Sequence, residues 1–329
     1  MASYYADHSQ QLRAELAKAI PLDSLRELHQ KRPLLHALLA ALNVVVLVVA
    51  AIGIAHLNHW YLWLPLSLVA GFAVFDFTVL LHEVVHRAVL SRSSDRIYRL
   101  LGLLYAVPSG ISASQFTRWH LDHHAGLGNA EEDPKRHYLS PKRNVRWLKA
   151  LYFTPALFPI YFRAAAAETA SYEPALRRRI GLERIGTIVF QLSVLFAIAW
   201  FGGWMLAIKL YVIPIFFVFP IAFALNRLGQ HYDIDPSDPA KWATLVKGSW
   251  FWDLAYLFSN YHLEHHYFPG VPFYNLPRLQ RLLTPFYERR GMVSRSYGEL
   301  LWGWFVLNRS PHSKWERSEG RTQVVNVEG

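Results

Sequence analysis

Long apolar runs alternate with polar segments along this 329-residue chain. Residues 34–57 and 60–81 form two nearly unbroken apolar runs, and residues 185–206 and 211–225 form a second pair. The first two runs are each about as long as the twenty residues that a helix needs to cross a bilayer. Only a few residues join the two runs within each pair. The pattern therefore predicts an all-α integral membrane protein with four transmembrane helices in two hairpins.

The segments outside these runs carry nearly all of the Lys and Arg residues. Residues 1–33 have apolar side chains at helical spacing, which predicts an amphipathic segment in the cytosol or at the membrane interface. Residues 34–285 are expected to form the membrane domain, and residues 286–329 a cytosolic tail whose last twenty residues are loose. Because Lys and Arg favour the cytoplasmic side, we expect a multi-pass protein with both termini in the cytosol.

The amino-acid composition excludes several kinds of functional site. The chain has no cysteine, which excludes disulfides, thiolate metal sites and cysteine nucleophiles. Its net charge of +10 is placed beside the apolar runs, which favours contact with anionic lipid headgroups over nucleic-acid binding. Sixteen histidines remain as the main source of metal ligands.

Nine of these histidines fall in short groups next to the predicted spans. Residues 82–86 read HEVVH, residues 120–124 read HLDHH and residues 262–266 read HLEHH, and a lone histidine comes after the fourth span. Side chains three and four residues apart share one helix face, so each group presents two or three imidazoles together. The predicted topology places all of them in a cytosolic helical cap on one side of the membrane. Imidazole suits iron, zinc, copper and nickel, and nine ligands exceed the needs of one ion. We therefore expect two metal ions, held by His82, His86, His120, His123, His124, His231, His262, His265 and His266.

Acidic residues accompany each histidine group. Glu83, Asp122 and Glu264 lie within the three groups. Metal-bound imidazoles usually donate their second N–H to a carboxylate or carbonyl, so these acids are predicted to orient the rings. Asp76 lies seven residues before Glu83, on nearly the same helix face. It is predicted either to support the same site or to face a neighbouring helix.

Two other interpretations of the histidines need weighing. His-Glu-x-x-His at residues 82–86 is also the signature of zinc metalloproteases, in which Glu83 would be the general base. A tetrahedral zinc site needs few ligands and would leave most of the clustered histidines without a role. A metal carrier or transporter should line a path across the membrane with ligands, yet the predicted spans contain few polar groups apart from Asp76.

The histidine groups and their flanking residues resemble the membrane fatty acid desaturase superfamily, and most closely its sphingolipid (ceramide) desaturase branch. The likeness covers roughly residues 34–285 and rests on HEVVH at 82–86, RWHLDHH at 118–124, GQHY at 229–232 and NYHLEHHYFPGVPFYNLPRL at 260–279. It implies two iron ions on the nine histidines and molecular oxygen as the oxidant. It also implies a separate electron donor of the cytochrome b5 or ferredoxin type, because no such domain is visible in the sequence. Asn226 is a candidate for a water-mediated metal contact, although it precedes the lone histidine by five residues where acyl-CoA desaturases use four.

The expected function is an oxygen-dependent di-iron desaturase that introduces a double bond into an acyl chain, in a fatty acyl lipid or a sphingolipid. The main alternative is a lipid or carotenoid hydroxylase or ketolase, which shares the first hydrogen abstraction and differs in the second step of the reaction. The membrane zinc metalloprotease remains as a third alternative of another class. The expected partners are the acyl substrate, surrounding membrane lipids and the electron-transfer protein.

Overall fold

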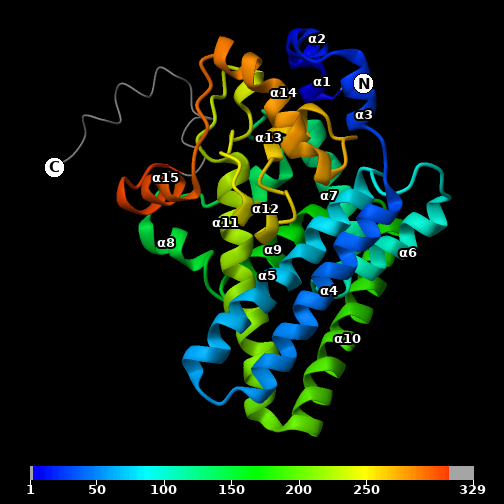
Figure 1. The fold of residues 1–329 in the computed structure, drawn as a ribbon, viewed down its shortest axis with the longest axis vertical. Coiled ribbons are helices and arrows are strands. Elements are labelled where there is room, and N and C mark those ends of the chain that lie inside the picture. Colours follow the sequence, from blue (N-terminus) through cyan, green and yellow to red (C-terminus); the bar gives the residue numbers. More distant parts are fainter. Residues whose placement is uncertain (1–2, 311–329) are drawn as a thin grey trace.

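A computed structural model describes residues 3–310 of the chain, and the regular secondary structure of these residues is almost entirely helical (Figure 1). The one piece of β-structure among them is an isolated bridge between Val246 and Arg295. The long helical elements are α4 (Pro33–His56), α5 (Trp60–Val85), α10 (Pro174–Ala207), the π-helical stretch η2 (Ile208–Val218) and α11 (Phe219–His231). The predicted all-α class is thus confirmed.

Shorter helices surround the ends of these long elements. Those at the N-terminus and in the loop after α5 are α1 (Tyr4–His8), α2 (Gln10–Ala19), α3 (Leu22–Leu28), α6 (Asp95–Ala106), α7 (Ala113–Gly126), η1 (Lys135–Leu139), α8 (Arg146–Leu151) and α9 (Leu157–Ala170). Those after α11 are η3 (Pro239–Lys241), α12 (Trp250–Ala255), α13 (His262–Tyr267), η4 (Phe273–Asn275), α14 (Leu276–Arg289), α15 (Tyr297–Leu301) and η5 (Trp302–Val306). Figure 1 shows α1–α3, α13 and α14 gathered at one end of the molecule, with the long helices extending from the other.

Within residues 3–310, three helices are long and apolar enough to cross a membrane: Pro33–His56, Trp60–Val85 and the continuous stretch Pro174–His231. The third stretch contains Gly203, whose backbone is non-helical, with φ 79° and ψ 164°. Glycine adopts a positive φ readily because it has no Cβ. Near this point the chain reverses, and Figure 1 shows it returning alongside α10 through η2 to α11.

Large apolar side chains cover the outside of the long helices. Val49 of α4 is 61% exposed, and Trp200 and Phe201, in α10 just before Gly203, are 85% and 87% exposed. A continuous apolar surface of this kind is rare on proteins surrounded by water and marks contact with lipid or another apolar partner. In contrast, the window of α5 that could span the membrane is mostly buried, because α4 and η2 pack on it.

The N-terminal segment is helical as predicted, but its apolar face packs against protein. Leu12 and Leu16 of α2 are 3% exposed and belong to the main hydrophobic core. Helix α2 lies against α14, and Glu15 forms an ion pair with Arg290 at the end of α14. The predicted amphipathic helical pattern is present, and α14 covers the apolar stripe of α2.

The boundary expected between residues 285 and 286 falls inside α14. Phe286 and Tyr287 are 2% and 5% exposed, so they anchor the chain in the core. Helix α15 comes next and packs on α11. Residues 286–310 are consequently part of the fold rather than a tail. The loose end expected over the last twenty residues lies, apart from Ser310, outside the described residues.

Candidate metal centre

The predicted histidine groups lie on four helices that meet at one end of α5. The first group closes α5, the second lies on α7, the third opens α13, and His231 is the last residue of α11. Helix α5 packs against α7 and α11, and α11 packs against α13. The fold thus brings together segments that are separated by up to 184 positions, from His82 to His266.

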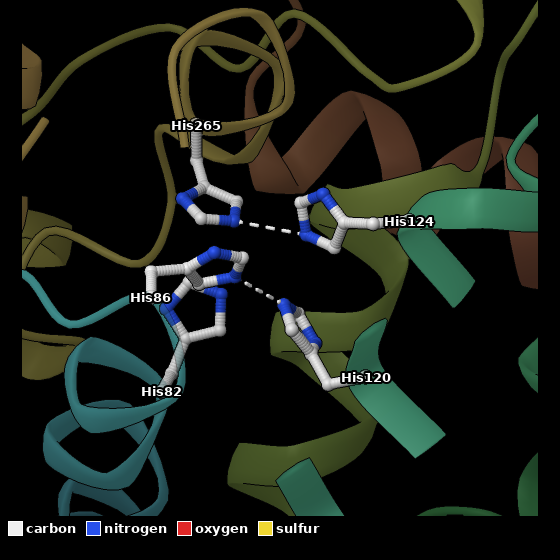
Figure 2. Close-up of side chains that lie close together, drawn as sticks. All are labelled: His82, His86, His120, His124 and His265. Atoms are coloured by element: carbon white, nitrogen blue, oxygen red, sulfur yellow. Dashed lines mark hydrogen bonds between the residues drawn. The ribbon is translucent and has the colours of Figure 1, made fainter. Parts of the chain in front are cut away.

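The nine histidines form two clusters. The five-histidine cluster consists of His82, His86, His120, His124 and His265, and the four-histidine cluster of His123, His231, His262 and His266. Within each cluster the ring nitrogens lie within 4.8 Å of one another. Figure 2 shows the five rings of the first cluster directed toward a common centre. All nine predicted ligands are therefore brought together, in two groups.

Helices α7 and α13 each contribute to both clusters. The residues of α7 four positions apart, His120 and His124, enter the five-histidine cluster, while His123 enters the other. Helix α13 does the reverse: its i and i+4 residues enter the four-histidine cluster, while His265 enters the five-histidine one. The two clusters are consequently adjacent, because each of these short helices borders both.

The hydrogen bonds of the four-histidine cluster indicate a cation at its centre. His123 Nδ1 donates to Asp133 Oδ1 at 2.8 Å, and His231 Nδ1 donates to the Trp242 carbonyl at 3.0 Å. A neutral imidazole carries one N–H, so the two Nε2 atoms, 3.0 Å apart, face each other as lone pairs. His262 Nε2 lies 2.9 Å from His231 Nε2. Nitrogen ligands at about 2.0–2.1 Å from one ion are separated by roughly 3.0–3.4 Å. The spacing therefore fits one bound metal ion.

The five-histidine cluster has the same spacing. His86 Nε2 lies 2.8 Å from His120 Nε2, and His265 Nε2 lies 3.1 Å from His124 Nε2. On its other side, His120 Nδ1 is 2.9 Å from Lys135 Nζ. Burial lowers the pKa of Lys135, which favours the neutral amine that can accept the His120 N–H. His120 Nε2 is then free to bind a metal ion.

Burial also keeps the clustered histidines in the form that binds metals. Removal from water disfavours the charged imidazolium and is the largest cause that lowers the pKa of the histidines outside the long helices. These are His86, His120, His123, His124, His262, His265 and His266. Neutral imidazole is the metal-binding species, so the site is prepared for metal at neutral pH.

Of the four acids predicted to support the site, Glu83 lies against a ligand. Its Oε1 is 3.6 Å from His82 Nδ1, and its Oε2 accepts the Phe273 backbone N–H at 3.0 Å. Asp76 is buried in α5 and lies near Tyr256, at the end of α12.

The structure contradicts the predicted role of Asp122. Its carboxylate forms an ion pair with Arg118 at 2.8 Å on the outer face of α7. The inward face of α7 is occupied by the three histidines. A residue one position before His123 points about 100° away from it on a helix with 3.6 residues per turn. Asp122 therefore pairs with Arg118, one turn earlier, instead of orienting a ring.

Glu264 is fully buried, but it faces α14 rather than an imidazole. It accepts hydrogen bonds from Tyr287 Oη at 2.7 Å and Gln280 Nε2 at 2.9 Å. Burial raises the pKa of Glu264, and these two donors oppose that shift. The carboxylate thus ties α13 to α14 and holds the third histidine group in place from behind, instead of bonding to a ring as predicted.

Three groups of the site were absent from the sequence-based prediction: Asp133, Lys135 and the Trp242 carbonyl. Asp133 lies ten residues after His123, in the loop after α7, and it also accepts the backbone N–H of Lys135 at 2.9 Å. No periodicity links a loop carboxylate to a helical histidine, and a backbone carbonyl leaves no trace in a sequence. These partners depend on the tertiary path of the chain.

An apolar cavity of about 310 Å³ borders histidines of both clusters. Among its lining residues are His82 and His120 of one cluster and His262 of the other. Its apolar walls come from α5, α9, α10, η2 and α11. Phe162 and Ile188 on its rim are 44% and 57% exposed, on helices whose outer surface is apolar. The cavity thus joins the metal centre to the face of the molecule suited to lipid.

Asn226 also lines this cavity. Its side-chain oxygen accepts a hydrogen bond from Gln230 at 2.6 Å, and its side-chain nitrogen donates to Ser259 Oγ at 3.2 Å. The amide is therefore fixed at the wall of the cavity that His262 also lines.

The fold and the site together define a helical membrane protein with a histidine-rich two-metal centre. A family model described as "Fatty acid desaturase" matches residues 58–298, which is most of the chain. The chain therefore belongs to the fatty acid desaturase family and is an oxidoreductase of the desaturase class. Its two histidine clusters form the di-metal site that this family shares.

Individual relatives share about a quarter of their residues with this chain, over most of their length. The sphingolipid delta(4)-desaturase/C4-monooxygenase DES2 of Homo sapiens is 26% identical over 258 residues, covering 74% of this chain and 72% of the human protein. The sphingolipid delta(4)-desaturase DES1 of Xenopus tropicalis is 26% identical over 325 residues, covering 90% and 91%. The dihydrorhizobitoxine desaturase of Bradyrhizobium elkanii is 26% identical over 275 residues, covering 77% and 76%.

Proposed function

We propose that this chain is an oxygen-dependent di-iron desaturase that introduces a double bond into the acyl chain of a fatty acyl lipid or sphingolipid. The observation that carries the proposal is the apolar cavity that borders both histidine clusters and reaches the lipid-facing side of the molecule. The human and Xenopus relatives are named for sphingolipid desaturation. A lipid substrate is consistent with the apolar cavity and with the names of these relatives.

Iron fits the donor set. All nine candidate ligands are imidazoles, which suit iron, and the chain contains no thiolate that would favour a softer metal site. Bound iron would supply the activation of oxygen and the removal of hydrogen from carbon, with electrons from a separate protein of the cytochrome b5 or ferredoxin type. Asn226 is proposed as a water-mediated contact of one ion.

The chain's own residues have three tasks in this mechanism. Asp133 and the Trp242 carbonyl hold His123 and His231 in one orientation, so their Nε2 atoms stay directed at the metal. The apolar walls exclude water and hold the acyl chain so that one carbon lies against the two clusters. An error of about an ångström in that position would change the rate strongly.

We further propose that the chain crosses the membrane four times, with both termini and both clusters on the cytosolic side. The reversal of the chain near Gly203 supports two crossings within Pro174–His231. The Lys and Arg residues are concentrated outside the long helices, which favours the cytosol for those segments. Residues 34–285 would then supply the membrane part, and residues 286–310 would complete its cytosolic side.

A hydroxylase is the second candidate, because the human relative carries the activity C4-monooxygenase in its name beside desaturase. Desaturation and hydroxylation both begin with the removal of one hydrogen and differ in the step that follows. The zinc-protease alternative is not supported by the geometry. Glu83, its general base, accepts the Phe273 N–H and lies beside His82 Nδ1.

Lipid mass spectrometry of cells that express the protein tests the proposal. We expect a new lipid lacking two hydrogens with the wild type, and none with His265→Ala, which removes a ligand from the five-histidine cluster. His137→Ala is the matched control, because His137 is exposed and belongs to neither cluster. A product with one added oxygen would show that the protein is a hydroxylase and not a desaturase. Equal lipid profiles in all strains supplied with a donor would contradict the proposal.

A further inference from the structure

Arg227 places a permanent positive charge on the wall of the apolar cavity. It lies on α11, one turn before His231, so the two side chains share a helix face. Arg227 lines the 310 Å³ cavity, and it also lines a smaller cavity of about 60 Å³ that borders His231. Arg227 therefore borders two cavities, and each of them also borders at least one histidine of the metal centre.

No acid balances this charge directly. Among residues 3–310, no carboxylate lies within 4.0 Å of the Arg227 guanidinium, and no hydrogen bond from it to a side chain or carbonyl is present. Asp133 is the acid whose field reaches it. However, Asp133 Oδ1 already accepts from His123 and from the backbone of Lys135. A guanidinium stays protonated in proteins. Arg227 is half-buried, and a partly desolvated charge without a partner is costly.

Among residues 3–310, no Asp or Glu lines either of these two cavities. The nine ligands are neutral imidazoles, so they do not offset the charge of two metal ions. Most of the other residues that line the cavity are apolar. An anion in the cavity would balance Arg227, and the five donors of a guanidinium match the paired oxygens of carboxylate and phosphate.

We propose that the substrate carries an anionic head group, a carboxylate or phosphate, that binds Arg227 inside this cavity. The apolar remainder of the substrate then lies along the walls from α9, α10 and η2. Because Arg227 is one helical turn from His231, the carbon presented to the metals lies only a few bonds from the head group. This inference rests on the proposed function, since it specifies the substrate of the same site.

Binding of three probes with the same chain length tests the proposal. Palmitic acid, hexadecyl phosphate and the uncharged palmitamide are titrated against the purified full-length protein in detergent, without oxygen or electron donor. The variants are Arg227→Gln, Arg227→Lys and the control Arg163→Gln, in which an exposed arginine of α9 is neutralised. Charge-assisted hydrogen bonds are among the strongest in proteins.

In the wild type, we expect at least one anionic probe to bind roughly tenfold or more tightly than palmitamide. Arg227→Gln removes that preference and leaves palmitamide binding unchanged, whereas Arg227→Lys retains part of it and Arg163→Gln retains all of it. The anion preferred by the wild type distinguishes a carboxylate from a phosphate.

Three results would overturn the proposal: equal binding of charged and uncharged probes by the wild type, no binding of either anion, or an equal loss for all probes in Arg227→Gln. The first two need no variant, so a folding defect in Arg227→Gln does not affect them. Because no oxidation occurs in this assay, a preference for anions is separable from the lipid analysis that tests desaturation.

Discussion

The two histidine clusters differ in burial and in the support behind their rings. All four histidines of the four-histidine cluster are buried, whereas His82, His86 and His124 of the five-histidine cluster are only partly buried. In the four-histidine cluster, a carboxylate and a carbonyl fix His123 and His231. In the other, His120 faces an amine and His82 lies 3.6 Å from a carboxylate.

This difference shows two ways of holding a metal ion. A ring whose second nitrogen donates a hydrogen bond is fixed in tautomer and orientation before the metal arrives. The four-histidine cluster therefore depends on a few well-placed partners outside it. The five-histidine cluster has one more ligand and looser support, so it depends more on the number of its ligands.

The largest expected effect is the loss of one metal ion and of activity when a histidine of α13 is replaced. Two histidines of this short helix allow each cluster to be tested separately. His262→Ala removes a ligand from the four-histidine cluster, and His265→Ala removes one from the five-histidine cluster. We expect each variant to lose most of one metal ion, to keep the other, and to lose activity at least 100-fold, because both ions are needed. Elemental analysis of the purified variants measures this.

Loss of both ions in either variant would mean that the two clusters fill cooperatively and are not independent. A His137→Ala control, outside both clusters, should retain the metal content and activity of the wild type.

A smaller effect is expected from the acids on α7 and in the loop after it. Asp133→Asn weakens the hydrogen bond that orients His123, and removal of such partners typically lowers metal affinity 10- to 100-fold. Asp122→Asn breaks only the outer ion pair with Arg118, so metal affinity should not change. Metal titrations of both variants measure the difference. The opposite order would restore the role that the sequence suggested for Asp122.

The sequence predicted the parts of this protein that depend on local periodicity. The apolar runs matched the long helices, and the i, i+3 and i+4 spacing identified eight of the nine clustered histidines, all except the lone His231. The division between clusters was not predictable, because His123 and His124 are neighbours in the chain and enter different clusters. That division depends on where α11 and α13 approach α7.

The wrong or missing predictions concern residues whose partners are set by tertiary packing and not by local spacing. Glu264 sits in a histidine group, yet it bonds to Tyr287 and Gln280 because α14 packs behind α13. Asp133 has no regular spacing from the ligand that it orients. The packing of residues 286–310 was missed because the local sequence does not show that Phe286 and Tyr287 lie in the core.

The central claim is that each chain holds two iron ions, one in each cluster. The most direct test is elemental analysis of the wild-type protein, purified after growth with both iron and zinc, together with the protein concentration. We predict an iron-to-protein ratio near two with little zinc. A ratio near one, or zinc in place of iron, would contradict the claim.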